Sequence, residues 1–256
     1  MIINQKSIGV FDSGIGGLTV VKKINELMPE ENIIYIGDTA NVPYGTKSPE
    51  EIKKLVFGLV DKLLSFDVKA IVIACNTADS IVGDILRNEC KVPVFGVVEP
   101  AANEAVRISR NKKIGLIATN AAVNNGTYQN TIKALDNQAE VFAVACPLLV
   151  PFAEAGRFEK EDTEVKEALK SYLLPLKEKN IDTLILGCTH YPLFEDMIKE
   201  ILPEINIVSS SDTAAKKLKD NLYEISDKPI SDNKIYVTKN PSEVKEKAKI
   251  FMEDIN

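Results

Sequence analysis

Two cysteines stand in nearly the same sequence context in the two halves of the chain. Each follows an apolar run of strand length and precedes hydroxyl or amide side chains, as Cys75-Asn76-Thr77 after residues 71–74 and Cys188-Thr189-His190 after residues 184–187. An apolar run that stops at polar residues is typical of a buried parallel strand at its carboxyl end, and ligands of open α/β sheets bind at that end. The sequence therefore predicts two thiols at equivalent strand ends, an arrangement suited to a reaction that acts on both faces of one substrate.

The ionisation of these thiols decides whether they can act as acids and bases. A free cysteine usually packs as a small apolar residue, and this is our interpretation of Cys90 and Cys146. Cys75 and Cys188 can instead meet a substrate and the N-terminal dipole of a following helix, which lowers a thiol pKa from about 8.5. We therefore expect lowered thiol pKa values at both positions.

A zinc site is the rival interpretation of the same residues. Cys75, Cys188 and His190, the one histidine in the chain, could supply the three protein ligands of a catalytic zinc. No CxxC or HxxxH pair supports this reading, so we expect no metal.

Three further segments carry polar groups. The turn at 12–17 lacks the third glycine of a dinucleotide fingerprint, because Thr19 stands there, so we expect it to bring Asp12 and Ser13 into the site rather than to bind a nucleotide. Asp38 and Thr39 fit turn and cap positions. Pro43-Tyr44-Gly45 fits either an ordinary loop or a rigid loop that presents backbone amides and a phenol to a small ligand.

Composition excludes several classes of partner. The 256 residues carry a net charge of -6, which argues against nucleic acid or an acidic membrane surface as the main partner. No apolar stretch approaches the roughly 20 residues of a membrane-spanning helix. The first six residues show no secretory signal, and the four cysteines are widely spread. We therefore expect reduced thiols and a cytoplasmic protein.

The elements that position these residues alternate between strand and helix. Segment 51–64 has apolar residues at a 3.6-residue period, and Ser48-Pro49 is a typical helix start. This alternation predicts an α/β fold with doubly wound parallel sheets. Strands are predicted at 7–12, 32–37, 70–75, 92–98, 113–118, 139–145, 182–187, 205–208 and 234–237.

The near-repeat of the two cysteine strands predicts two similar halves facing each other. Proline disfavours helix in the residue before it, which places a boundary near Glu99-Pro100. Three serines at 209–211 interrupt the pattern and mark a return crossing. The predicted domains are 1–98 plus 209–256, which carries Cys75, and 99–208, which carries Cys188.

Four motifs together resemble the signature set of glutamate racemases, members of the cofactor-independent aspartate/glutamate racemase superfamily. They occur in the family's order and roughly at its spacing, and the resemblance covers essentially the whole chain. The motifs are Asp12-Ser13-Gly14-x-Gly16-Gly17, Pro43-Tyr44-Gly45, Ala74-Cys75-Asn76-Thr77 and Gly187-Cys188-Thr189-His190-Tyr191-Pro192.

The resemblance implies two pseudo-symmetric α/β domains with the active site between them. It also implies interconversion of L- and D-glutamate without a cofactor, supplying D-glutamate for peptidoglycan. Cys75 and Cys188 would be the acid/base pair, with Asp12 assisting Cys75, and with Glu154 and His190 assisting Cys188. By its setting alone, Glu154 fits a solvated acid at a helix start. The substrate-binding set implied by the resemblance is Asp12, Ser13, Pro43, Tyr44, Gly45, Asn76, Thr77, Thr119, Thr189 and His190.

The chain departs from the family pattern at a few positions. Ala122 and Asn125 replace a threonine and a serine of the central segment, Ala101 stands in place of a glycine, and Asp79 in place of a small residue. We expect these changes to lie near the substrate pocket, where they bear on affinity or on the choice of amino acid.

Two alternative functions stay open at this point. One is a racemase of another amino acid, such as aspartate, and the other is a non-catalytic amino-acid or zinc-binding protein on the same scaffold. The expected partner is the small-molecule substrate glutamate, and a homodimer is the assembly we expect if the chain associates.

Overall fold

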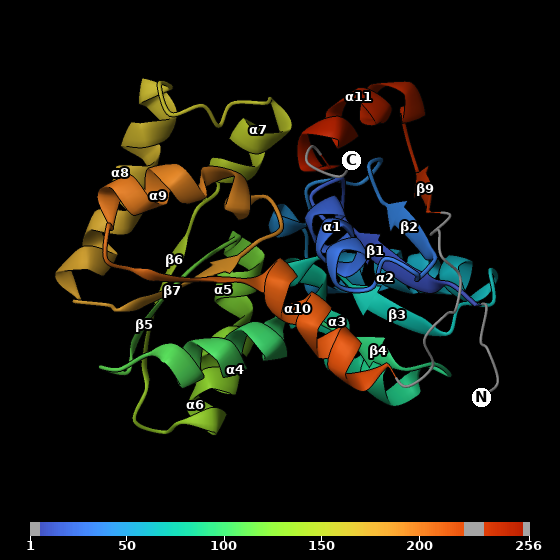
Figure 1. Ribbon diagram of the computed structural model, residues 1–256, viewed down its shortest axis with the longest axis horizontal. Helices are drawn as coiled ribbons and strands as arrows, with labels where there is room; N and C mark the ends of the chain where they lie inside the picture. Colours follow the sequence, from blue (N-terminus) through green and yellow to red (C-terminus); the bar gives the residue numbers. More distant parts are fainter. Residues whose placement is uncertain (1–5, 223–232, 253–256) are drawn as a thin grey trace.

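The computed structural model describes residues 6–222 and 233–252, which fold into two α/β lobes, each with its own parallel sheet (Figure 1). Residues 1–5, which entered the expectation about a leader segment, lie outside the described residues. In the part of the chain that the structure describes, no helix is long and apolar enough to cross a membrane.

The first sheet has the strand order β4-β3-β1-β2-β9, with every pair parallel. Its strands come from both ends of the described chain, so the first lobe is discontinuous. They are β1 (Ile8–Asp12), β2 (Ile33–Gly37), β3 (Ala70–Ile73), β4 (Val94–Phe95) and β9 (Lys234–Val237).

The second sheet has the order β6-β5-β7-β8 and is also parallel throughout. It comprises β5 (Lys113–Ala118), β6 (Glu140–Ala145), β7 (Thr183–Gly187) and β8 (Asn206–Ser209). All nine strands lie where the hydrophobic runs predicted them. The prediction of a strand over 92–98 was too long, since β4 ends at Phe95 and Val98 already begins a helix.

The two sheets share one topological feature. From β1 the chain winds outward to β2, then returns to place β3 on the other side of β1, and β5, β6 and β7 repeat this path. Each sheet therefore has a switch point, between β1 and β3 and between β5 and β7, where helices leave on opposite faces and the carboxyl ends open a crevice. Cys75 follows β3 and Cys188 follows β7, so the two thiols occupy equivalent places beside the two switch points.

Helices connect the strands of the first lobe. The helix α2 (Pro49–Leu64) begins where Ser48-Pro49 predicted a helix start, and Ser48 and Glu51 form a capping box there. The remaining helices associated with this lobe are α1 (Leu18–Leu27), the short helix Tyr44–Thr46, α3 (Asn76–Glu89), α10 (Ser210–Asn221) and α11 (Pro241–Met252).

The second lobe has α4 (Val98–Ile108) at its start. Pro100 lies in the first turn of α4, where its missing N–H is not needed, so it marks no break in the chain. The predicted boundary between the two domains, at residues 98 and 99, stays a prediction. The chain crosses back to the first lobe from β8 into α10. The other helices are α5 (Asn120–Asn125), α6 (Thr127–Leu135), α7 (Leu149–Glu154), α8 (Thr163–Glu178), the short helix Tyr191–Phe194 and α9 (Glu195–Ile201).

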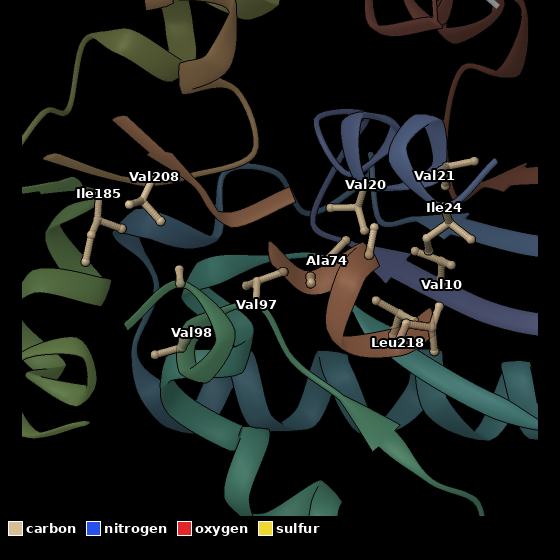
Figure 2. Packing of buried hydrophobic residues seen from close by; sticks show 14 of the residues in the cluster. Val10, Val20, Val21, Ile24, Ala74, Val97, Val98, Ile185, Val208 and Leu218 are labelled. Carbon is tan, nitrogen blue, oxygen red and sulfur yellow. The ribbon is translucent and has the colours of Figure 1, made fainter. Parts of the chain in front are cut away.

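A single apolar cluster joins the lobes (Figure 2). Val10 and Ile24 of the first lobe belong to the same buried cluster as Ile185 and Val208 of the second, and Leu218 of α10 packs into it from the crossing helix. Separate clusters cover the outer faces of the two sheets. The shared core holds the two switch points against each other, which is what a site built from both sheets requires.

Candidate active site

The carboxyl ends of β1, β3, β5 and β7 surround a cavity of about 20 Å³. This volume holds about one water molecule, so a larger ligand enters only if the lobes or the lining side chains move. Twelve of the thirteen predicted site residues line it. The lining consists of Asp12, Ser13, Val42, Pro43, Tyr44, Gly45, Cys75, Asn76, Thr77, Thr119, Val150, Cys188, Thr189 and His190.

Cys75 is the residue that precedes the first turn of α3 and is 4% exposed. Its Sγ lies 3.5 Å from Oγ of Ser13. Burial, followed by the negative charge of Asp12, raises the pKa of the Cys75 thiol to about 12, against the smaller effect of hydrogen bonds from Ala78 and Ser13. The expectation of a lowered pKa at Cys75 was therefore wrong, because the loss of hydration outweighs the donors of the helix N-terminus.

Asp12 is held by the glycine turn that follows β1. Its Oδ2 accepts hydrogen bonds from the backbone N–H of Gly14 at 3.1 Å and of Gly17 at 3.0 Å. Its Oδ1 is buried and has no hydrogen-bond partner among the described residues. Burial raises the pKa of Asp12, although His190 and the backbone donors act in the opposite direction.

The glycines of this turn allow neighbouring parts of the chain to approach closely. A Cβ at Gly17 would lie 2.6 Å from Cβ of Asp12, and one at Gly16 would lie 2.5 Å from Cε1 of His190 in the other lobe. A side chain at Gly16 would thus push the two lobes apart at the cavity.

Cys188, His190 and Glu154 form a chain of contacts on the opposite side. Sγ of Cys188 lies 3.8 Å from Nδ1 of His190, and Nε2 of His190 lies 2.8 Å from Oε1 of Glu154. Burial alone lowers the pKa of His190, but the hydrogen bonds and charges of Cys188 and Glu154 outweigh it and raise the pKa to about 10. His190 is therefore a cation at neutral pH, and its positive charge lies beside the Cys188 sulfur.

Glu154 is the one predicted site residue that does not line the cavity. It lies at the last residue of α7 and borders a neighbouring cavity of about 130 Å³ with Gly14 and Lys239. Its contact with the site runs through His190, which agrees with an assisting position rather than direct contact with a ligand.

Three of the predicted binding side chains have their polar groups occupied by protein partners. Tyr44 lines the cavity, and its hydroxyl donates to Oδ2 of Asp38 at 2.7 Å. The hydroxyls of Thr77 and Thr119 are 2.8 Å apart and join the two lobes across the cavity.

The structure adds residues that sequence reasoning missed. Val42, in a loop, and Val150, in α7, line the cavity, but an isolated apolar residue gives no signal of this position in the sequence. Asp38 is 2% exposed and holds Tyr44, Asn41 and Thr238, a larger part than the turn or cap expected of it. Phe251 of α11 packs edge-on against the His190 ring, with 5.6 Å between centroids.

The departures from the family pattern do not contribute to the cavity lining, and their effect on affinity or on the choice of amino acid stays a prediction. Ala122 is buried in α5, whose start Thr119 caps, and Asn125 donates to the carbonyl of Ser80. Ala101 is buried in α4. None of these three residues, nor Asp79, contributes to the lining of the cavity.

Within residues 6–222 and 233–252, no three His, Cys, Asp or Glu side chains come together in an arrangement that could hold a metal ion. The zinc interpretation of Cys75, Cys188 and His190 therefore has no support from the positions of these side chains.

Comparison with known proteins agrees with this arrangement. Residues 8–218 match the model of the family described as Asp/Glu/Hydantoin racemase. The chain is 46% identical over 232 residues to glutamate racemase of Sulfurihydrogenibium sp., covering 90% of this chain and 88% of that protein. The crystal structure of a Bacillus anthracis glutamate racemase isoform superposes with a TM-score of 0.92 at 38% identity, covering 96% of this chain and 94% of that one. Glutamate racemase of Francisella tularensis, solved in complex with D-glutamate, gives 0.91 at 36% identity, covering 97% and 94%. The chain belongs to the Asp/Glu/Hydantoin racemase family.

Proposed function

We propose that this protein is a cofactor-independent glutamate racemase that interconverts L- and D-glutamate with Cys75 and Cys188 as its acid/base pair. One observation carries the proposal: the two thiols follow equivalent strands of two sheets with the same winding, and both line one cavity. Two groups placed in this way suit removal of a proton from one face of the α-carbon and delivery of another to the opposite face.

The surroundings of the two thiols differ. Cys75 keeps its proton at neutral pH, because its pKa is about 12. Nδ1 of His190 lies 3.8 Å from the Cys188 sulfur, and the pKa of that ring is raised to about 10. In the proposed reaction of L-glutamate, Cys188 takes the α-proton, and Cys75 delivers its own proton to the other face.

The carbanionic intermediate gathers charge on the substrate carboxylate, so oriented donors must hold that group. Asn76 and Thr77, which open α3, line the cavity together with Ser13 and Thr189 and suit this task. After the L-to-D reaction Cys188 carries the proton and Cys75 lacks one, which is the state required for reaction of D-glutamate.

The proposal extends to the role implied by the family resemblance. D-glutamate made in the cytoplasm would supply peptidoglycan synthesis and thereby cell-wall formation and cell shape. A homodimer is the proposed assembly if the chain associates.

The test uses the purified protein with L-Glu, D-Glu, L-Asp or D-Asp, no added cofactor and a chelator present. Circular dichroism should decay to zero from either enantiomer of glutamate, and carbonyl reagents that trap pyridoxal phosphate should leave the rate unchanged. Conversion of aspartate in place of glutamate would assign a different substrate. Loss of activity to the chelator with recovery on adding zinc would overturn the two-thiol mechanism.

A further inference from the structure

The side-chain amide of Asn76 is held from two sides. Its Nδ2 donates to Oγ of Ser210 at 3.1 Å, and its Oδ1 accepts from the hydroxyl of Tyr128 at 2.5 Å. Asn76 is 2% exposed and lines the cavity between the thiols. An asparagine amide has two N–H donors and an oxygen that accepts twice. One N–H and one acceptor site therefore stay available to a ligand in the cavity.

The partners of Asn76 come from different parts of the fold. Asn76 opens α3 in the first lobe, Tyr128 lies in α6 of the second lobe, and Ser210 opens α10 on the crossing back. Because an amide rotates freely about its last side-chain bond, two partners on fixed helices are needed to set its plane. The direction of the free N–H is thus decided by how the lobes meet.

Tyr128 is suited to be a permanent donor. It has no exposed surface, and burial raises the pKa of its hydroxyl well above the ordinary value, so the proton stays on the oxygen across the working pH range. A hydroxyl that always donates toward Asn76 keeps Oδ1 on the side of α6 and leaves Nδ2 for Ser210 and the cavity.

We propose that Tyr128 is a positioning residue that orients the Asn76 amide, so that its remaining N–H is directed at the carboxylate of the substrate amino acid. This inference rests on the proposed racemase function. Tyr128 itself does not line the cavity, so it acts through Asn76.

A matched control exists in the same lobe. Tyr191 also has no exposed surface, and its hydroxyl donates to the carbonyl of Cys146 at 3.0 Å rather than to a cavity residue. Tyr128→Phe and Tyr191→Phe each remove one buried hydroxyl and one hydrogen bond, but only Tyr128→Phe frees the Asn76 amide.

The experiment measures steady-state racemisation of both glutamate enantiomers in wild type, Tyr128→Phe, Tyr191→Phe, Asn76→Ala and the double variant Asn76→Ala/Tyr128→Phe. We expect Tyr128→Phe to lower kcat/KM about tenfold for both enantiomers, because a buried acceptor loses its donor and the amide loses its orientation. Tyr191→Phe should stay within about twofold of wild type. In the Asn76→Ala background, Tyr128→Phe should have almost no further effect, since residues that act as a unit are not additive.

Additive losses in the double variant, or equal losses in the two phenylalanine variants, would overturn the inference and assign Tyr128 to packing alone. Ser210→Ala removes the other bond to the amide and provides a second route if Tyr128→Phe does not fold. If Ser210→Ala lowers kcat/KM severalfold, but has no such effect in the Asn76→Ala background, the inference is supported. If Ser210→Ala leaves the kinetics unchanged, the inference is contradicted. An inactive wild type would instead be a failure of the proposed function.

Discussion

Glu154 and His190 are joined by a hydrogen bond of 2.8 Å between Oε1 and Nε2, which links the end of α7 to the segment after β7. The other ring nitrogen of His190 faces the sulfur of Cys188. Glu154 therefore acts on the Cys188 thiol through His190, without touching it. The charge state of the ring is therefore the property to measure first.

The pKa of His190 can be read directly, because it is the single histidine of the chain. An NMR titration of its ring protons should give a midpoint near pH 10 rather than near the ordinary 6.5. Glu154→Gln should lower this midpoint, because it removes a charge that favours the protonated ring. A wild-type midpoint near 6.5 would contradict the cationic ring.

The same shift predicts how stability depends on pH. Because the folded-state pKa of His190 lies above 6.5, the protonated ring stabilises the folded protein fully below pH 6.5, and this contribution is lost as the pH rises through 10. Urea unfolding should therefore show the largest difference between wild type and Glu154→Gln at or below pH 6.5. A difference that grows toward pH 10 would have the wrong sign.

Asp12→Asn should make Cys75 more reactive. The negative charge of Asp12 is the second cause, after burial, of the raised pKa of the Cys75 thiol, and an asparagine oxygen can still accept from Gly14 and Gly17. The midpoint of the pH profile for alkylation of Cys75, followed by peptide mass spectrometry, should move below 12. Asp67→Asn removes an exposed carboxylate before β3 and should leave the profile unchanged. An unchanged or higher midpoint in Asp12→Asn would contradict the effect of its charge.

Cys75→Ser and Cys188→Ser should each abolish racemisation, with losses of about 10³-fold or more, because a serine hydroxyl is a far weaker acid than a thiol. Each variant should still abstract a proton from one face. With an analogue that carries a leaving group at the β-carbon, one variant should eliminate mainly from one enantiomer and the other from its mirror image. The family resemblance assigns Cys75 to the D form and Cys188 to the L form. Elimination from the same enantiomer by both variants would exclude opposed thiols.

Glu154→Gln and His190→Asn should affect the two directions of reaction unequally, because both residues lie on the Cys188 side only. The equilibrium between enantiomers fixes the ratio of the two kcat/KM values. The asymmetry must therefore be sought in kcat and KM separately, or in isotope effects at the α-position. Equal changes in every parameter, with folding intact by circular dichroism, would assign both residues a purely structural part.

Asp79→Ala should destabilise the protein by about 3 kcal/mol, since it removes a buried carboxylate and leaves its donors unpaired. Oδ2 of Asp79 accepts from the backbone N–H of Val97 and Val98 at 2.8 Å, and Oδ1 accepts from Arg87 at 2.9 Å. Asp84→Ala is the matched control, because Asp84 pairs with the same Arg87 but has an 89% exposed side chain. Urea midpoints that fall equally in the two variants would show that burial of Asp79 contributes nothing.

The sequence by itself determined the secondary-structure elements of this protein and the candidates for its site residues. Uninterrupted apolar runs and stripes of period 3.6 depend on neighbours along the chain, so the nine strands of the described residues and the helix start at Ser48 could be predicted locally. The two cysteine contexts are local as well. Cys75 and Cys188 both line one cavity, and their acid/base role stays a prediction.

Only the tertiary structure decided the environment of each group. The winding of the sheets puts Cys75 and Cys188 beside equivalent switch points, and no local pattern encodes strand order. The raised pKa of Cys75 arises from burial and from Asp12, which is 63 positions earlier in the chain, and the occupied amide of Asn76 depends on Tyr128 and Ser210. Hydration and charge act through space, so their balance is set where the lobes meet and not by the residues that flank a motif.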